Sequence, residues 1–114
     1  MTTKDLYWLA GLLEGEGSFD YQCRESEQRH GRPRIQFAST DHDIAVRVAA
    51  LFKKRVNGPY RAYGGQLNKK PMYKVLLSGP RAVGLMFTLW SILGTRRREQ
   101  IKVSVARWRA ARAA

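Results

Sequence analysis

The sequence of 114 residues predicts a single α+β domain in which helices and β-hairpins follow one another in the order αββαββαα. Two segments alternate polar and apolar residues with period two, which is typical of half-buried strands. Other segments repeat apolar residues at helical spacing, and glycines or polar loops separate the elements. No internal repeat or low-complexity linker interrupts residues 1–114. We therefore expect one domain built on a four-stranded antiparallel sheet.

The N-terminal half is expected to contain a helix, a hairpin and a second helix. Thr2 or Thr3 can cap a first helix over residues 4–15, which the glycines at 15 and 17 end. Segments 18–24 and 32–38 alternate in polarity around a polar loop, so they are predicted to pair. Thr40 can cap a second helix, which is expected to end near Asn57 and Gly58.

The C-terminal half repeats the hairpin and adds two helices. Residues 60–63 and 72–77 are predicted to form the second hairpin. Ser78 and Pro80 begin an apolar helix that extends to Leu93, because proline is favoured in the first turn. Gly94 ends this helix, and Thr95 can cap a last basic helix. Its inward positions are Ile101, Val105 and Trp108.

Charge points to a nucleic-acid partner. The chain has 21 lysines and arginines against nine acids, a net charge of +12. Residues 1–43 carry a net charge of −3, whereas residues 44–114 hold sixteen basic residues and a single acid, Glu99. Such a surface repels itself unless it meets a polyanion. A solvated basic surface, a ribosome-type binder and an anionic-membrane binder are the alternatives.

Several classes of protein are disfavoured by composition. One cysteine, Cys23, excludes an internal disulfide framework, and together with two histidines it excludes a cysteine–histidine zinc site. The apolar run 82–93 is too short to span a bilayer. The first residues lack the apolar core of a secretion signal. We therefore expect a soluble intracellular protein without a membrane partner.

One face of the predicted sheet is rich in side chains that bind DNA. Arginine can pair bidentately with guanine and glutamine with adenine in the major groove, which accepts a β-ribbon. An ordinary solvated face would mix acids with its basic residues, but Asp20 is the only acid among the assigned outward positions. The candidate DNA-contacting residues are Gln22, Arg24, Arg32, Arg34, Gln36, Arg61, Tyr63, Lys70 and Lys74.

Residues 9–19, Leu-Ala-Gly-Leu-Leu-Glu-Gly-Glu-Gly-Ser-Phe, resemble the signature of the LAGLIDADG homing endonucleases. That family accepts Asp or Glu at the acidic positions, so Glu14 and Glu16 conform to it. The expected order of elements also fits over nearly the whole chain. The resemblance implies the homing-endonuclease fold, in which the four-stranded sheet forms a DNA-binding saddle.

A single copy of the motif implies a homodimer. Gly11 and Gly15 lie four residues apart, on one helix face, and their lack of side chains lets two helices approach closely. The dimer would place Glu16 beside its copy in the other subunit, on the surface between the two subunits that faces DNA. Two such carboxylates repel unless divalent cations neutralise them. The implied cofactor is Mg²⁺ or Mn²⁺, held by Glu16 and the Gly15 carbonyl, with Ca²⁺ supporting binding without efficient cutting.

The resemblance also suggests further site residues. In the family, basic and polar side chains surround the metals, and the matching positions here are Asp41 and Arg97. Both depart from the usual residue types, which are glutamine and lysine. Arg97 could stabilise developing charge but is a poor proton donor or acceptor. Alternatively, residues 96–98 clamp phosphates and Asp41 only supports a helix N-terminus. Glu14 is expected to be structural.

The function implied is that of a homodimeric, metal-dependent, site-specific endonuclease of a mobile genetic element, which cuts both strands of a long pseudo-palindromic DNA duplex. A non-cleaving binder on the same scaffold, either an intron maturase or a transcription regulator, is the alternative. A general basic nucleic-acid module is a third possibility.

Overall fold

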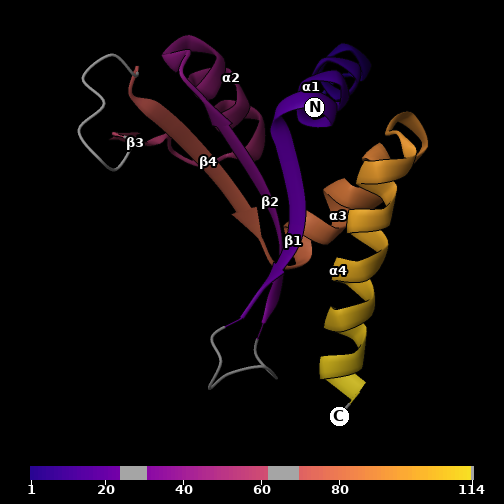
Figure 1. The fold of residues 1–114 in the computed structure, drawn as a ribbon. Helices are drawn as coiled ribbons and strands as arrows, with labels where there is room; N and C mark the ends of the chain where they lie inside the picture. Colours follow the sequence, from indigo (N-terminus) through magenta and orange to yellow (C-terminus); the bar gives the residue numbers. More distant parts are fainter. Residues whose placement is uncertain (24–30, 62–69, 114) are drawn as a thin grey trace.

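The computed structural model describes residues 1–23, 31–61 and 70–113, and it has the predicted alternation of helices and strands (Figure 1). The first half contains α1 (Thr3–Glu16), β1 (Gly17–Gln22), β2 (Arg32–Ser39) and α2 (His42–Phe52). The second half contains β3 (Asn57–Tyr60), β4 (Met72–Ser78), α3 (Pro80–Leu89), the 3₁₀ turn η2 (Trp90–Ile92) and α4 (Thr95–Ala113). The α+β fold class predicted from the sequence is confirmed.

The four strands form one antiparallel sheet in the order β1-β2-β4-β3. Asp20 of β1 lies opposite Arg34 of β2, and Gln36 lies opposite Leu76 of β4. Side chains alternate between the two faces of the central strand β2, where Pro33, Ile35 and Phe37 are buried while their polar neighbours are exposed or half-buried. The sheet therefore has one apolar and one polar face, as the alternation predicts.

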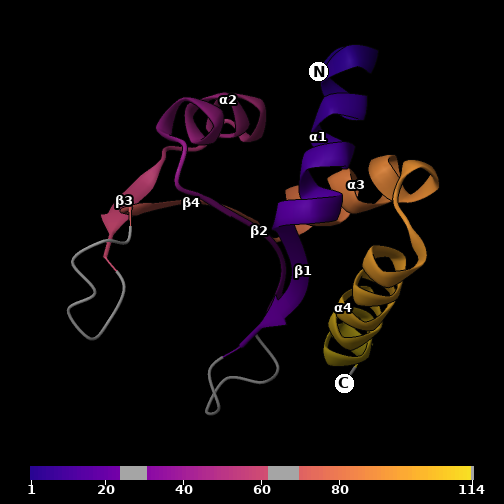
Figure 2. The ribbon, with the colours of Figure 1, turned by 45° about the horizontal axis from the view of Figure 1, so that its top comes forward.

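Helices cover the apolar face. Figure 2 shows α1, α2 and α3 on one side of the sheet, whereas α4 lies beside β1. Leu9 and Leu13 of α1, Phe52 of α2 and Met86 of α3 are buried together with Phe37 of the sheet. Burying a large apolar side chain stabilises the fold by about 1.5–3 kcal/mol. This packing leaves the polar face of the sheet uncovered by these three helices.

The first helix starts at a complete capping box. The Thr2 side chain accepts a hydrogen bond from the Asp5 backbone N–H, and the Asp5 carboxylate accepts one from the Thr2 N–H at 2.9 Å. The hydrogen bond from the Thr2 backbone holds the pKa of Asp5 below its usual value. Arg47 of α2 stacks on the Trp8 ring of α1, 3.8 Å from its centroid, and links the two helices.

The end of α1 and the beginning of β1 follow without a loop. Gly17 donates its backbone N–H to the Leu13 carbonyl and so ends the helix, and it pairs with Phe37 in the sheet. A Cβ at position 17 would lie 2.6 Å from Leu13 Cδ2 and 2.9 Å from Leu13 Cα and its carbonyl oxygen. Glycine is therefore required at this junction, because the helix backbone passes too close for a side chain.

Some element boundaries differ from those expected. Helix α2 ends at Phe52 rather than near Asn57, because Lys53 takes the left-handed conformation and caps the helix. Its N-cap is Asp41 and not Thr40. The chain between 57 and 60 is then free to form β3, which was expected to begin at Tyr60. The third helix ends as an α-helix at Leu89 and continues only as the 3₁₀ turn.

We predict that Gly17→Ala lowers the free energy of unfolding by about 1–3 kcal/mol, because the added methyl group meets the Leu13 backbone. Gly84→Ala in α3 is the matched control, since its methyl group would meet no atom within 4 Å other than the adjoining backbone of its own helix. This control is expected to gain up to about 1 kcal/mol from helix propensity. Denaturant unfolding measures the free energy of unfolding of both variants. An equal change in the two would contradict the close approach of residue 17 to the Leu13 backbone.

Candidate functional site

Glu16 is the last residue of α1, one position further into the helix than expected, and it is exposed. It makes no hydrogen bond or ion pair with any residue that the structure describes. Gly15, whose carbonyl is the second candidate ligand, is exposed beside it. A carboxylate and a backbone carbonyl are the oxygen donors that Mg²⁺ and Ca²⁺ prefer. The chemistry of this helix end therefore fits a hard divalent cation.

Glu14, two residues earlier, is used within the chain. One of its carboxylate oxygens accepts a hydrogen bond from the Gly94 backbone N–H, just before α4. The other lies 3.8 Å from Nε of Arg97. This glutamate ties the end of α1 to the start of α4, which agrees with the structural role expected for it.

Arg97 is buried, with 6% of its surface exposed, at the C-terminal end of α1. Its Nε donates to the Glu14 backbone carbonyl at 3.1 Å, and its Nη1 donates to Gln100 Oε1 at 3.2 Å. A cation at a helix C-terminus is stabilised by the helix dipole. The arginine, the third residue of α4, thus contributes a fixed positive charge near the motif.

The neighbouring candidates differ in their surroundings. Arg98 donates to the carbonyls of Trp90 and Ser91, whereas Arg96 is exposed. Asp41 is exposed at the N-cap of α2, and its side chain makes no capping hydrogen bond. Of residues 96–98, Arg96 is accordingly the most accessible to a phosphate.

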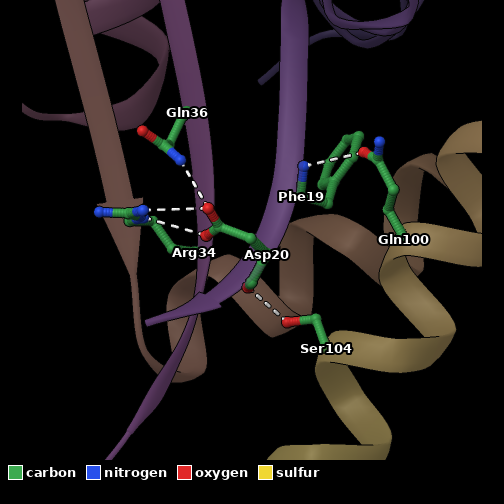
Figure 3. A network of polar contacts seen from close by, with 6 residues as sticks. All are labelled: Phe19, Asp20, Arg34, Gln36, Gln100 and Ser104. Carbon is green, nitrogen blue, oxygen red and sulfur yellow. Dashed lines mark hydrogen bonds and ion pairs between the residues drawn. The ribbon is translucent and has the colours of Figure 1, made fainter. Parts of the chain in front are cut away.

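Two polar side chains of α4 hold the outer edge of β1 (Figure 3). The Phe19 backbone N–H donates to Gln100 Oε1 at 3.1 Å, and the Ser104 hydroxyl donates to the Asp20 carbonyl at 2.6 Å. These bonds satisfy backbone groups that an edge strand otherwise leaves open. Neither residue was among those expected from the sequence. Their i, i+4 spacing on a basic helix is the only signal that the sequence contains.

The predicted DNA-contacting residues that the structure describes share the polar face of the sheet or its margins. Gln22, Arg32 and Lys74 are exposed on β1, β2 and β4, and Arg34 and Gln36 are half-buried at the centre of β2. Arg61 and Lys70 are exposed just outside β3 and β4. Arg24 and Tyr63 lie outside the described residues.

This face also holds an acid, on the edge strand β1 beside the central strand β2. Asp20 accepts two hydrogen bonds from Arg34, at 3.0 Å from Nε and 2.9 Å from Nη2, and one from Gln36 Nε2 at 2.6 Å. Figure 3 shows the three side chains converging from β1 and β2. The alternation of residues 18–24 predicted that this aspartate faces outward, but it indicated no role for the side chain.

A second surface lies along α1. Tyr7 is 61% exposed, and Gly11 and Gly15 follow it at four-residue intervals, both exposed. Apart from the adjoining backbone of the helix itself, no described atom would lie within 4 Å of a Cβ at either glycine. This side of α1 is therefore flat and open within the part of the chain that the structure describes.

Clustered metal ligands and membrane-spanning helices are both absent from the described residues. Across residues 1–23, 31–61 and 70–113, no three His, Cys, Asp or Glu side chains gather closely enough to hold a metal ion. Over the same residues, no helix combines the length and apolar character needed to cross a membrane.

We predict that Glu14→Gln lowers the free energy of unfolding by about 1–3 kcal/mol, because buried Arg97 loses its nearest carboxylate. Glu16→Gln, the same substitution at an exposed residue of the same helix, is expected to change stability by less than about 0.5 kcal/mol. Thermal or denaturant unfolding of the two variants checks this. A larger loss of stability in Glu16→Gln than in Glu14→Gln would contradict the assignment of Glu14 as the structural acid.

Comparisons with known proteins give a consistent picture of the fold. No protein-family profile and no curated protein matches the sequence. Among solved structures, the homing endonuclease I-CvuI in complex with the I-CreI target is 20% identical, with a TM-score of 0.64 over 92% of this chain and 68% of that one. I-CeuI, described as a group I intron-encoded homing endonuclease complexed with DNA, is 16% identical, with a TM-score of 0.60.

The LAGLIDADG homing endonuclease I-LtrWI, bound to target DNA, is 15% identical, with a TM-score of 0.62. The present chain spans 54% of I-CeuI and 37% of I-LtrWI. At these identities the likeness concerns the fold, and it agrees with the motif at residues 9–19. The chain therefore has the fold of the LAGLIDADG homing endonucleases, and the segment that resembles their signature lies at the end of α1 and the start of β1.

Proposed function

We propose that this chain is a homodimeric, site-specific DNA endonuclease that hydrolyses phosphodiester bonds with the help of a divalent metal ion. The observation that carries the proposal is the position of Glu16. It is an exposed carboxylate, unpaired among the described residues, at the end of α1 and directly before the first residue of β1. The solved structures of similar fold that are described as complexes with DNA support a DNA substrate.

Dimerisation would follow from the open side of α1. Gly11 and Gly15 allow the backbones of two helices to approach, and a two-fold axis along this side pairs each residue with its own copy. Tyr7, at the same helical interval, would supply apolar area to the contact. The two helix ends, and therefore two copies of Glu16, would then lie next to each other.

In such a dimer, Glu16 and the Gly15 carbonyl would hold Mg²⁺ or Mn²⁺, and phosphate oxygens would complete the ligand set. A bound divalent cation supplies Lewis-acid polarisation of the phosphate and lowers the pKa of water. Glu16 would bind the cation, and Gly15, which has no side chain, would leave room for the DNA backbone. The structures of I-CvuI with Mg and with Ca support the use of a divalent metal.

Arg97 would contribute positive charge near these ligands without binding the cation itself. Its guanidinium is fixed by Glu14 and Gln100, so its charge stays beneath the end of α1. A fixed cation stabilises negative charge that develops on a nearby phosphate without reorganising. Asp41 lies at the N-cap of α2 and, in this proposal, helps to order water around the reacting groups.

Target recognition would use the polar face of the sheet in the major groove. Its exposed margin carries Arg32, Arg61, Lys70 and Lys74, which suit phosphate contacts, while Arg34 and Gln36 at the centre suit bases. Two copies related by a two-fold axis would read a nearly palindromic duplex. Binding is expected to weaken steeply with salt, because many phosphates are neutralised.

We predict that Glu16→Gln abolishes double-strand cutting in Mg²⁺ but retains binding in Ca²⁺, because it removes one carboxylate oxygen ligand without changing the sheet. The substrate is a duplex pool selected for binding by the wild-type chain in Ca²⁺. Electrophoresis reports cutting, and fluorescence anisotropy reports binding. Glu99→Gln, which also removes one exposed negative charge, is the control and is expected to cut.

Cutting by Glu16→Gln at the wild-type rate would contradict the metal-ligand assignment. Specific binding by the wild-type chain with no cutting in any divalent metal would instead identify a non-cleaving binder, such as a regulator or maturase.

We predict that Gly11→Leu converts the dimer to a monomer, because a leucine side chain would hold the two α1 backbones apart. Gly84→Leu is the matched control, since Gly84 is also an exposed helical glycine with open space around it. Sedimentation velocity distinguishes the two species. A dimeric Gly11→Leu variant, or a monomeric wild type at all concentrations and on DNA, would refute this interface.

A further inference from the structure

We propose that Asp20 is a specificity-determining residue, which positions Arg34 and Gln36 to read base edges rather than phosphates. This inference rests on the proposed function, because it concerns how the polar face of the sheet selects a DNA sequence. The inference assigns a negatively charged side chain, Asp20, a role in recognising DNA, which is itself negatively charged.

The geometry of the cluster is specific. Asp20 and Arg34 are directly opposed in the β1–β2 register, and Gln36 is two residues further along β2. Both carboxylate oxygens are used, because Oδ1 accepts from Arg34 Nε at 3.0 Å and Oδ2 accepts from Arg34 Nη2 and Gln36 Nε2. Two-point contacts of this kind fix the plane of a guanidinium.

The strand beneath the cluster is also held in place. The Asp20 carbonyl accepts a hydrogen bond from the Ser104 hydroxyl, and the N–H of the preceding residue, Phe19, donates to Gln100. Arg34 lies on the central strand β2, paired with β1 on one side and with Ser78 of β4 on the other. The acid thus connects two base-reading side chains to a rigid part of the sheet.

The hydrogen-bonding groups left over match particular bases. Asp20 uses Nε and one Nη2 proton of Arg34, so the Nη1–Nη2 edge stays available for the O6 and N7 acceptors of guanine. Gln36 spends one amide proton on Asp20 and keeps its Oε1 and a second N–H, the pair that recognises adenine. Figure 3 shows an Arg34 nitrogen and the Gln36 oxygen directed away from the carboxylate.

Electrostatics favours bases over phosphates as partners. A phosphate that contacted Arg34 would lie close to the Asp20 carboxylate, and two like charges at short range repel. A base edge carries no net charge and meets no such repulsion. Surface ion pairs contribute only about 0–1 kcal/mol to stability, so stability alone gives little reason for an acid on a DNA-binding face. The Asp20 and Arg34 side chains are 37% and 20% exposed, which leaves them accessible to DNA.

The experiment measures base preference at each position of the half-site. Duplexes that the wild-type chain selects from a randomised library in Ca²⁺ give a consensus, and a panel of single base-pair changes is then competed against it. Arg34→Ala is expected to lose about 5- to 150-fold of discrimination at one base pair of each half-site. Asp20→Asn is expected to weaken the base preference at that same base pair. It should also weaken the preference at the base pair where Gln36→Ala does so.

Two further variants sharpen the test. The double variant Asp20→Asn/Arg34→Ala is expected to discriminate no worse at the Arg34 base pair than Arg34→Ala alone, because the aspartate acts there through the arginine. Glu99→Gln is the control for loss of one negative charge, and it should strengthen binding to all sequences equally. If Asp20→Asn fails to fold, as judged by circular dichroism, Arg34→Lys replaces it. Arg34→Lys keeps the positive charge but loses the two-point contact with Asp20. It must therefore weaken the base preference at the same base pair.

Either of two results would overturn the proposal. One is an Asp20→Asn variant, or Arg34→Lys in its place, that keeps the wild-type base preferences. The other is a change at a base pair that neither Arg34→Ala nor Gln36→Ala affects, which would mean that the aspartate contacts a base itself. Both leave the proposed endonuclease function intact. A wild-type chain that selects no consensus would overturn site-specific recognition and this inference together.

Discussion

The direct passage from α1 into β1 is the constraint on which the arrangement depends. Gly17 ends the helix through its bond to Leu13 and begins the strand opposite Phe37, so no loop separates the two elements. The preceding residue, Glu16, is thereby held at the point where the helix meets the sheet. The position of one carboxylate thus follows from a close approach of backbone atoms.

Three acids of the described chain have distinct structural uses. Asp5 caps α1, Glu14 holds the start of α4, and Asp20 organises Arg34 and Gln36. The side chain of Glu16, like those of Asp41, Asp43 and Glu99, makes no polar contact with any described residue. A carboxylate that met DNA phosphates would be repelled by them unless a cation lay between the two. Of the two neighbouring glutamates, Glu14 is already used within the chain and Glu16 is left accessible to a cation, which supports the proposed metal-binding role.

Much of the fold was predictable from local patterns. The alternation of residues 32–38 determined which face of β2 is polar, because side-chain direction in a strand repeats every two residues. The boundaries near Lys53 and Asn57 were not predictable, because lysine has no preference for the left-handed conformation that ends α2. The contacts of Gln100 and Ser104 with β1 depend on where α4 docks, which no short-range pattern encodes. The motif located Glu16, but only the register across strands showed that Asp20, Arg34 and Gln36 meet.

The symmetry of the DNA sequence that the wild-type chain selects tests the central claim most directly, because it reports dimerisation and base reading in one measurement. Selection from a randomised duplex library in Ca²⁺, followed by sequencing, gives this result even though the target sequence is unknown. A dimer paired along α1 predicts two half-sites related by an approximate two-fold axis, with the strongest preferences in the segments that the two sheets contact. A single asymmetric half-site, or no enriched sequence, would contradict the paired arrangement of α1 and of Glu16.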